Sequence, residues 1–349
     1  MNSKEILDDI SKHLTGDPEK DGPFLKEQSE KYKEHEENEA INRGLAKMLY
    51  EIVSDDYFTN LHTYLENENK NVAEQLENVL ELYQKHSYSA GISVLEEIIK
   101  NNILAWRDTE EYTYKSFGSP LEYSVYLKLS GDEREIRSVN CDMSEVYRLY
   151  GFGLIEQNKI NEARDALEQS VKFNPVNPNA LFEYSEILKL RNNMKKLREV
   201  TDWILKCAVT KDQLSAAYRN YAYYFVEQHD YKNAFAMVEM SRIFGDSKSA
   251  DSEYEYVIRT LGMKPKTHTN QELMDIMLKE NIQPGPSSIV VELAYMFGKN
   301  SEQNLDYKLA IYFYKVVYEL LEEPQMAQHI SELEQTVAGL EYERKNNNS

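Results

Sequence analysis

Apolar residues in the middle of the chain return at the spacing of amphipathic helices. Within 144–177 they recur every three or four positions up to Ile155 and again, after a short polar break, from Ile160. Asn174 and Pro175 end the second series, because proline disfavours helical conformation in the residue before it. The pattern predicts a hairpin of two helices in 34 residues.

The same pattern returns at Ser215, which lies 215 − 144 = 71 residues further along the chain. This separation is two 34-residue periods plus three residues, so a degenerate copy is expected between the two clear ones. Asn177 and Pro178 supply the N-cap and first-turn residues with which that middle copy begins. Three units are about the minimum for a stable stack. We therefore predict a core array of three hairpins, at 144–177, 178–214 and 215–248.

The repeat resembles the tetratricopeptide repeat (TPR), whose 34-residue consensus has an aromatic residue at position 4, small residues at 8 and 20, and proline at 32. Small residues are needed where the two helices of a hairpin cross closely. Over about 115–260 the sequence is also similar to bacterial repeat proteins with no assigned activity. The resemblance implies an all-α fold, a right-handed α-solenoid of TPR-like helical hairpins with a divergent N-terminal helical region. The residues that fit the packing positions are Tyr147, Gly151, Ala163 and Pro175 in the first copy, and Tyr218, Ala222 and Ala234 in the third.

The match weakens on both sides of the array. Residues 1–70 are predicted to form a charged N-terminal helical region, in which 26–44 has sparse apolar residues and is expected to be a solvated helix or a loosely attached arm. A divergent helical hairpin followed by an irregular junction is expected within 71–142, with the junction at 107–142. Divergent helical hairpins are expected again over 249–349.

The composition narrows the classes of function. The 349 residues include 40 Lys and Arg against 60 Asp and Glu, a net charge of 40 − 60 = −20, which disfavours broad binding to nucleic acid or to a membrane surface. The 13 glycines and 9 prolines are few for a chain rich in β-turns or phosphate loops. Cys141 and Cys207 are too few for a disulfide framework, and no signal sequence or apolar run of membrane-spanning length is found. An acidic, soluble, cytoplasmic protein is therefore expected.

No pattern of catalytic or metal-binding residues stands out. The seven histidines are scattered, and no two are three to five residues apart, the spacing that places two metal ligands on one helical face. The Gly-Phe-Gly at 151–153 lies within an amphipathic helix and is interpreted as a helix crossing, not as a phosphate loop. We therefore expect no enzyme activity, no catalytic residue, no metal and no cofactor.

A binding surface follows from the family resemblance. In TPR proteins the first helices of the hairpins line a concave groove, and the corresponding positions here mix three cations with aromatic residues. One interpretation is a groove for an extended or helical peptide whose acidic groups pair with the cations. The other is that the cations only pair with neighbouring acids such as Glu145 and Glu186. The pattern that clamps the C-terminal carboxylate of chaperones fails at most positions. The candidate groove residues are Arg148, Phe152, Phe182, Glu186, Lys189, Arg219 and Tyr223.

The favoured function is a non-catalytic scaffold or adaptor that binds a protein or peptide segment with apolar and acidic groups. One alternative is a peptide-sensing regulatory protein whose N-terminal helical region acts on a response partner. A second alternative is an enzyme with an unrecognised site. Fold alone does not decide among these classes, because function is argued from a site. Neither nucleic acid nor a membrane is an expected partner, and the oligomeric state stays open.

Overall fold

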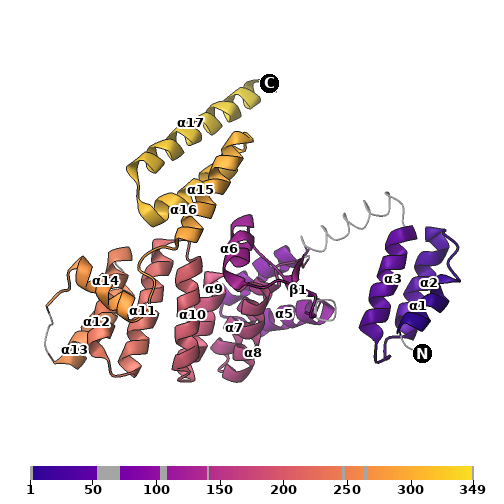
Figure 1. The fold of residues 1–349 in the computed structure, drawn as a ribbon, viewed down its shortest axis with the longest axis horizontal. Helices are drawn as coiled ribbons and strands as arrows, with labels where there is room; N and C mark the ends of the chain where they lie inside the picture. The colour runs from indigo at the N-terminus through magenta and orange to yellow at the C-terminus, as the bar shows by residue number, and fades with distance from the viewer. Residues whose placement is uncertain are drawn as a thin grey trace. The chain divides into compact units, whose positions relative to one another are not determined.

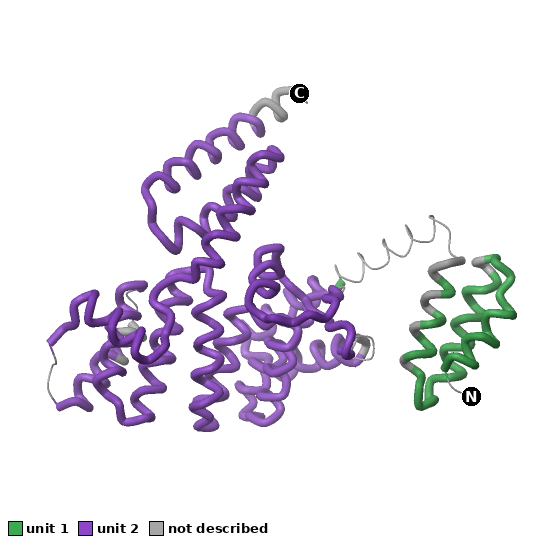
Figure 2. Tube along the Cα trace, viewed as in Figure 1, with its two compact units in different colours: residues 1–71 green, residues 72–349 purple. Residues whose placement is uncertain are grey.

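The computed structural model describes residues 3–52, 71–102, 108–139, 141–245, 248–262 and 266–347. In these ranges the regular structure is helical apart from two strands of four residues each, so the all-α class predicted from the spacing of apolar residues is confirmed (Figure 1). The chain divides into two compact units, Met1–Asn71 and Val72–Ser349 (Figure 2). Residues 53–70 of the predicted N-terminal region and 103–107 near the predicted junction lie outside the described residues. No helix in the described ranges is long and apolar enough to cross a membrane.

The described part of the first unit is built from three helices, α1 (Ser3–Ser11), α2 (Pro18–Lys31) and α3 (Asn38–Ile52). Helix α3 packs against both of the others. The highly charged segment expected to be a solvated helix or an arm is divided between the end of α2 and the beginning of α3. Its isoleucine belongs to a small core of Ile6, Ile10, Leu25, Ile41 and Leu45.

The second unit contains the repeat array. Each of its hairpins packs its two helices against each other, and the next first helix packs against the hairpin before it. The hairpins consist of a helix at 71–84 with α5 (Tyr88–Asn102), α7 (Met143–Glu156) with α8 (Ile160–Phe173), α9 (Pro178–Leu190) with α10 (Met194–Cys207), and α11 (Lys211–Glu227) with α12 (Tyr231–Phe244).

Each of these hairpins turns through one residue in the left-handed region of backbone conformation. In the first predicted repeat this residue is Asn158, with φ of 58°. Its N–H donates to the carbonyl of Ile155 at 2.8 Å, and the next N–H, of Lys159, donates to Leu154 at 2.9 Å. These bonds satisfy carbonyl groups that a helix end leaves open. The equivalent residues are His86, Asn192 and His229, and Asn and His are among the non-glycine residues that tolerate this conformation best.

Two glycines in α7 permit close helix packing. A Cβ atom on Gly151 would lie 2.6 Å from Cγ of Leu167 in α8, the partner helix of its own hairpin. A Cβ atom on Gly153 would lie 2.2 Å from the hydroxyl of Tyr83, in the preceding hairpin. The Tyr83 hydroxyl donates to the carbonyl of Leu149 at 3.0 Å. The Gly-Phe-Gly segment therefore lies where α7 is packed on both sides.

The stretch expected to be an irregular junction contains a small β-α-β unit. Strands β1 (Tyr112–Lys115) and β2 (Glu135–Ser138) pair in parallel, with Tyr112 opposite Glu135, and α6 (Pro120–Ser130) connects them. Ser119 is the N-cap of α6, because its side chain accepts a hydrogen bond from the N–H of Glu122. The unit thus gives regular structure to a sequence that has little helical periodicity.

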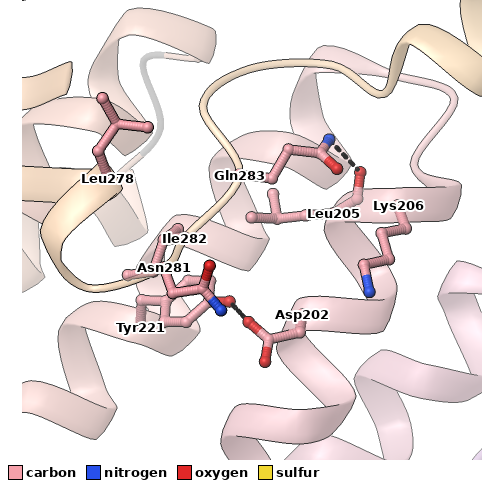
Figure 3. A pocket seen from close by; sticks show the side chains of 8 residues that line it. All are labelled: Asp202, Leu205, Lys206, Tyr221, Leu278, Asn281, Ile282 and Gln283. Atoms are coloured by element: carbon pink, nitrogen blue, oxygen red, sulfur yellow. Dashed lines mark hydrogen bonds between the residues drawn. The ribbon is translucent and has the colours of Figure 1, made fainter.

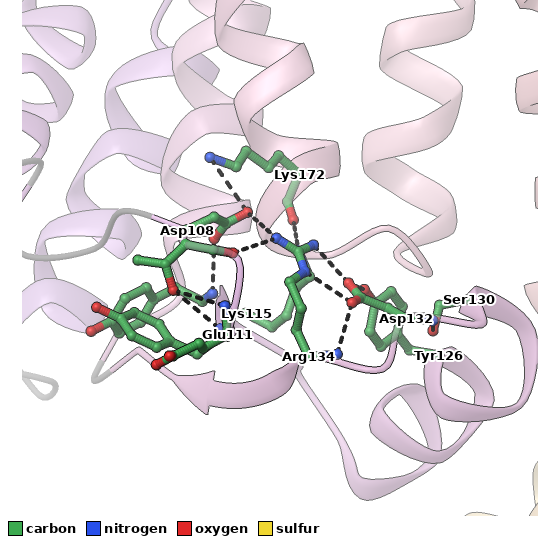
Figure 4. Close-up of polar contacts among 11 residues, drawn as sticks. Asp108, Glu111, Lys115, Tyr126, Ser130, Asp132, Arg134 and Lys172 are labelled. Carbon is green, nitrogen blue, oxygen red and sulfur yellow. Dashed lines mark hydrogen bonds and ion pairs between the residues drawn. The ribbon is translucent and has the colours of Figure 1, made fainter.

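Polar contacts fasten this β-α-β unit to the end of α8 (Figure 4). Arg134 donates to both carboxylate oxygens of Asp132, at 2.9 and 2.7 Å, and lies 3.7 Å from Asp108. The ammonium group of Lys115 donates to the carbonyl of Lys172, in the last turn of α8, at 2.9 Å. Asp108 also lies 3.7 Å from the ammonium group of Lys172. The cluster is therefore bound to the repeat array through α8.

After α12 the regular alternation of hairpins stops. Helix α14 packs against α12, α15 and α16 form a hairpin, and α17 packs against α16. Helix α15 also contacts α6 and α10. Beyond α12 the helices are α13 (Lys248–Leu261), α14 (Asn270–Lys279), α15 (Ser288–Gln303), α16 (Tyr307–Leu321) and α17 (Pro324–Asn347).

Candidate functional site

The predicted groove residues lie on α7, α9 and α11, the first helices of the three central hairpins. We call the side of these helices that carries them the first-helix face. Its residues are Arg148 and Phe152 on α7, Phe182, Glu186 and Lys189 on α9, and Arg219 and Tyr223 on α11.

Arg148 is held by acids of the chain itself. Its guanidinium group donates to both oxygens of Glu145 at 2.7 Å and lies 3.4 Å from Glu183 on the next first helix. Burial alone would lower the pKa of Arg148, but its bonds to Glu145 and the charge of Glu183 raise it. Burial raises the pKa of Glu183 even though Arg148 lowers it. Arg148 thus fits the interpretation in which a groove cation pairs with neighbouring acids.

The acid that pairs with Lys189 can be replaced more easily than the acids that pair with Arg148. Its ammonium group lies 2.7 Å from Glu186 and 5.4 Å from the centre of the Tyr223 ring, on the next first helix. The Lys189 side chain is only 18% exposed, whereas that of Glu186 is 60% exposed. The ring and the helix therefore hold the cation in place, while its carboxylate partner extends into solvent.

The other groove residues differ in how far they are covered. Arg219 donates to the hydroxyl of Ser215 at 2.8 Å. The ring of Phe152 lies 5.6 Å from that of Tyr83 and 6.3 Å from that of Tyr88, both in the preceding hairpin. Phe152 therefore contributes to packing between hairpins, whereas Phe182 and Tyr223 are half-buried on their own helices.

The predicted repeat-packing residues lie inside the hairpins, with the exception of Pro175 in the loop after α8. Tyr147 and Tyr218 each stack on the phenylalanine at the end of the partner helix, with ring centres 5.8 and 5.6 Å apart. Pro175 is half-buried, and its carbonyl accepts a hydrogen bond from the indole of Trp203. The buried members of the set are Tyr147, Gly151, Ala163, Tyr218, Ala222 and Ala234.

A series of tyrosine–carboxylate bonds joins successive hairpins on the opposite side of the array. In each case a first-helix tyrosine donates to an acid on the second helix of the preceding hairpin. The pairs are Tyr150 to Glu96 at 3.1 Å, Tyr184 to Glu168 at 2.9 Å, and Tyr221 to Asp202. If each repeat is counted from Val72, Ser144, Pro178 and Ser215, the tyrosines are all at position 7 and the acids all at position 25. The sequence contained this signal, since both positions repeat in register, but a single repeat does not reveal which acid meets which tyrosine.

One groove on this second-helix side is occupied by the chain itself. Side chains of α10 and α11 line this groove, and the segment that follows α14 lies in it (Figure 3). We call it the groove between α10 and α12, because Asn233 on α12 also donates a hydrogen bond to Glu280 at the end of α14. The Tyr218 hydroxyl donates to the carbonyl of Gln283 at 3.0 Å and accepts the N–H of Gly285 at 2.7 Å. Ile282 is buried, at 2% exposure, and the Gln283 side chain donates to the carbonyl of Leu205 at 3.3 Å. The segment 280–285, which includes the turn at the end of α14 and has Asn281 and Gly285 in left-handed conformation, thus binds the repeats of its own chain as a non-helical segment.

The equivalent groove between α5 and α8, with α7 as its floor, is a cavity of about 600 Å³. Its lining combines apolar side chains with charged residues of both signs. The residues around it are Glu96, Ile99, Lys100, Met143, Tyr147, Tyr150, Glu162, Asp165, Ala166, Gln169, Lys172 and Phe173. A volume of this size is within the range of ligand-binding clefts.

The described residues contain no group of three His, Cys, Asp or Glu side chains that could hold a metal ion. Cys207 is buried, and burial raises the pKa of its thiol.

These hairpins define the class of protein: the chain has a TPR-like helical repeat fold, in agreement with the resemblance drawn from the sequence. Among solved structures, it is similar to a tetratricopeptide repeat protein from Parabacteroides merdae, with 12% identity and a TM-score of 0.32 over 75% of this chain and 97% of that one. No protein-family model matches the chain, and no curated protein matches it.

Proposed function

We propose that the protein is a non-catalytic scaffold that binds a protein segment along its first-helix face. The observation that supports this proposal is the arrangement of Lys189 against the Tyr223 ring, with the exposed Glu186 as its partner. An ion pair with an exposed carboxylate contributes little free energy. A lysine held beside an aromatic ring can therefore exchange that carboxylate for one of the ligand with little loss of stability. The TPR-like fold, in which binding of protein segments is the common use, agrees with this role.

The chemistry of this face points to a segment that carries both apolar and acidic side chains. A ligand carboxylate would take the place of Glu186 at Lys189, and apolar side chains would contact Phe182 and Tyr223. Arg148 is already paired with Glu145 and Glu183, so it is expected to shape the surface more than to bind the ligand. The ligand is therefore expected to be selected mainly by α9 and α11.

The test is a peptide array of acidic–apolar segments, followed by titration of the best binder against variants of the full chain. Lys189→Glu and Tyr223→Ala are expected to weaken binding by about tenfold or more each. Lys196→Glu is the matched control, because Lys196 also pairs with an acid three residues away, Glu199, but lies on α10. Equal loss in Lys189→Glu and Lys196→Glu would reject this face as the binding surface.

A further inference from the structure

The two second-helix grooves described above have the same kinds of residue at the same repeat positions. One side of each groove is the second helix of the hairpin that comes earlier in the chain. This helix carries an acid at position 25, an aliphatic residue at position 28 and a lysine at position 29. These are Glu96, Ile99 and Lys100 for the groove between α5 and α8, and Asp202, Leu205 and Lys206 for the groove between α10 and α12.

The floors of the two grooves also correspond. Each has tyrosines at positions 4 and 7, and the first of them stacks on a phenylalanine at position 30 of the following second helix. The stacked pairs are Tyr147 with Phe173, at an interplanar angle of 13°, and Tyr218 with Phe244, at 16°. The two sites therefore present equivalent hydroxyl groups from equivalent rings.

The difference lies in what those hydroxyl groups bind. The Tyr218 hydroxyl forms two bonds with the backbone of the inserted segment, to Gln283 and Gly285. Tyr147 is 6% exposed as a residue, and its hydroxyl, which bonds to no other described residue, is not fully buried. Tyr147 lines a cavity of about 600 Å³, so a ligand group could reach this hydroxyl as Gln283 and Gly285 reach that of Tyr218. Among the described residues, the site that is filled in one repeat is open in the other.

We propose that the groove between α5 and α8 binds a non-helical segment of a partner protein that carries a lysine or arginine. Its backbone carbonyl and N–H would bond to the Tyr147 hydroxyl in the way that residues 283 and 285 bond to Tyr218. This site is distinct from the first-helix face and does not depend on ligand binding there.

The charge of the partner follows from one repeat position. At position 19 of the following second helix, Asn233 donates to the carboxylate of Glu280 in the inserted segment, at 3.2 Å. The open groove has Glu162 at this position and Asp165 three residues further on, so a carboxylate at the place of Glu280 would face two acids, while the lysines of the lining, Lys100 and Lys172, lie on α5 and at the end of α8. A cationic side chain at the place of Glu280 would instead pair with these acids.

The two grooves also differ at one anchor. Arg198, at position 21 of α10, donates to the carbonyl of Glu280 at the end of α14, whereas position 21 of α5 is the buried Ile92. The open groove lacks the group that receives a helix end. The partner is therefore expected to bind as a non-helical segment, without a helix such as the one that precedes the inserted segment.

The probe is a labelled synthetic peptide of residues 279–287 with Glu280→Lys, compared with the same peptide of natural sequence by fluorescence anisotropy on the full chain. The peptide with Glu280→Lys is expected to bind at least about tenfold more tightly than the natural one. Tyr147→Phe in the full chain removes only the hydroxyl and is expected to weaken binding by about tenfold. Glu162→Lys should reverse the preference between the two peptides.

Matched variants separate this site from the rest of the molecule. Tyr184→Phe removes a first-helix hydroxyl from the neighbouring groove, at position 7 and not at position 4, and is expected to leave binding unchanged. Tyr223→Ala disrupts the first-helix face and should also leave it unchanged, so the two proposals fail independently. Each variant is used only if its melting curve matches that of the parent chain.

Three results would overturn the proposal. The first is equal binding of the two peptides by the parent chain, or no binding of either. The second is binding of the Glu280→Lys peptide that Tyr147→Phe and Glu162→Lys leave intact. The third is self-association of the chain that Tyr147→Phe abolishes, because the occupant would then be a second copy and not a basic partner.

Discussion

At the scale of single residues, two glycines in helices have opposite surroundings. Gly153 in α7 has the Tyr83 hydroxyl 2.2 Å from the place of a Cβ atom, whereas Gly339 in α17 has nothing within 4 Å. Alanine at either position gains about 1 kcal/mol of helix propensity. At Gly153 this gain is opposed by overpacking and by loss of the bond from Tyr83 to Leu149.

We therefore expect Gly153→Ala to lower the free energy of unfolding by about 1–2 kcal/mol, and Gly339→Ala to raise the helicity and stability of α17 by up to about 1 kcal/mol. Chemical denaturation of both variants, followed by circular dichroism, checks the pair. A stabilised Gly153→Ala variant would mean that Tyr83 moves aside freely, and that the close packing of α7 on the preceding hairpin is not required.

Glu122 gives a prediction about pH. One of its oxygens accepts the N–H of Gly118 at 2.6 Å and the side-chain N–H of Asn174 at 2.8 Å. Burial raises the pKa of Glu122 above its ordinary value, although these bonds lower it. The native state then holds the proton more tightly than the unfolded state, so the contribution of Glu122 to stability falls as pH rises through the native pKa.

Glu122→Gln keeps an oxygen for both hydrogen bonds and removes the charge. We expect the stability of the parent chain relative to Glu122→Gln to decrease as pH rises from about 4.5, because Glu122 is the one side chain that titrates in the parent and not in the variant. Denaturation midpoints of the two proteins between pH 4 and 8 test this. Glu122→Ala is the control, since it loses both bonds and should be destabilised by about 1–3 kcal/mol at neutral pH. Parallel midpoints for parent and Gln variant would contradict the prediction.

At the scale of elements, several turns between helices contain one residue in the left-handed region of backbone conformation. Between α15 and α16 that residue is Leu305, with φ of 62° and a side chain that is 72% exposed. The side chain of a leucine, unlike that of asparagine, cannot form a local hydrogen bond that offsets the strain of this conformation, which costs about 1–2 kcal/mol, while glycine adopts it freely.

Leu305→Gly is expected to stabilise the chain by about 0.5–1 kcal/mol, after the entropy that glycine adds to the unfolded state is deducted. Asn304→Gly, one residue earlier at φ of −88°, should destabilise it instead, because no strain is relieved there. Thermal melts of the two variants give the comparison. If both move the melting temperature in the same direction, strain at Leu305 is not the cause.

The sequence predicted some elements well and others not at all, for physical reasons. The hairpins from α7 to α12 were predictable because small residues such as Gly151 and Ala163 recur where the helices cross. The strands β1 and β2 were not, because four-residue segments such as 112–115 form through pairing with residues that are distant in sequence. The sequence was enough to assign the groove cations to helices. It could not show that Arg148 pairs with Glu183, because this pair forms only when two repeats are stacked. The open groove was missed because it becomes visible only when two repeats are compared, one of them filled.

At the scale of the whole molecule, the described residues form two separate hydrophobic cores. One contains Ile41 and four other buried residues of the first unit, and the other runs through the whole of the second unit and contains Leu167. Both side chains have 0% exposure. The first core is small, and domains of about 60 residues are marginally stable. Loss of one core side chain should therefore have unequal effects in the two units.

We expect the full chain to unfold in two calorimetric transitions. Ile41→Ala should lower the free energy of unfolding of the first unit by about 2–5 kcal/mol, which is more than the stability of so small a core. The smaller transition should therefore disappear, while the larger one stays in place. Leu167→Ala should lower the temperature of the larger transition by several degrees without moving the smaller one. Differential scanning calorimetry of the parent and both variants decides the matter. A single transition that both substitutions shift together would mean that the two cores unfold as one cooperative unit, and that the charged N-terminal helices are a part of the repeat array's stability.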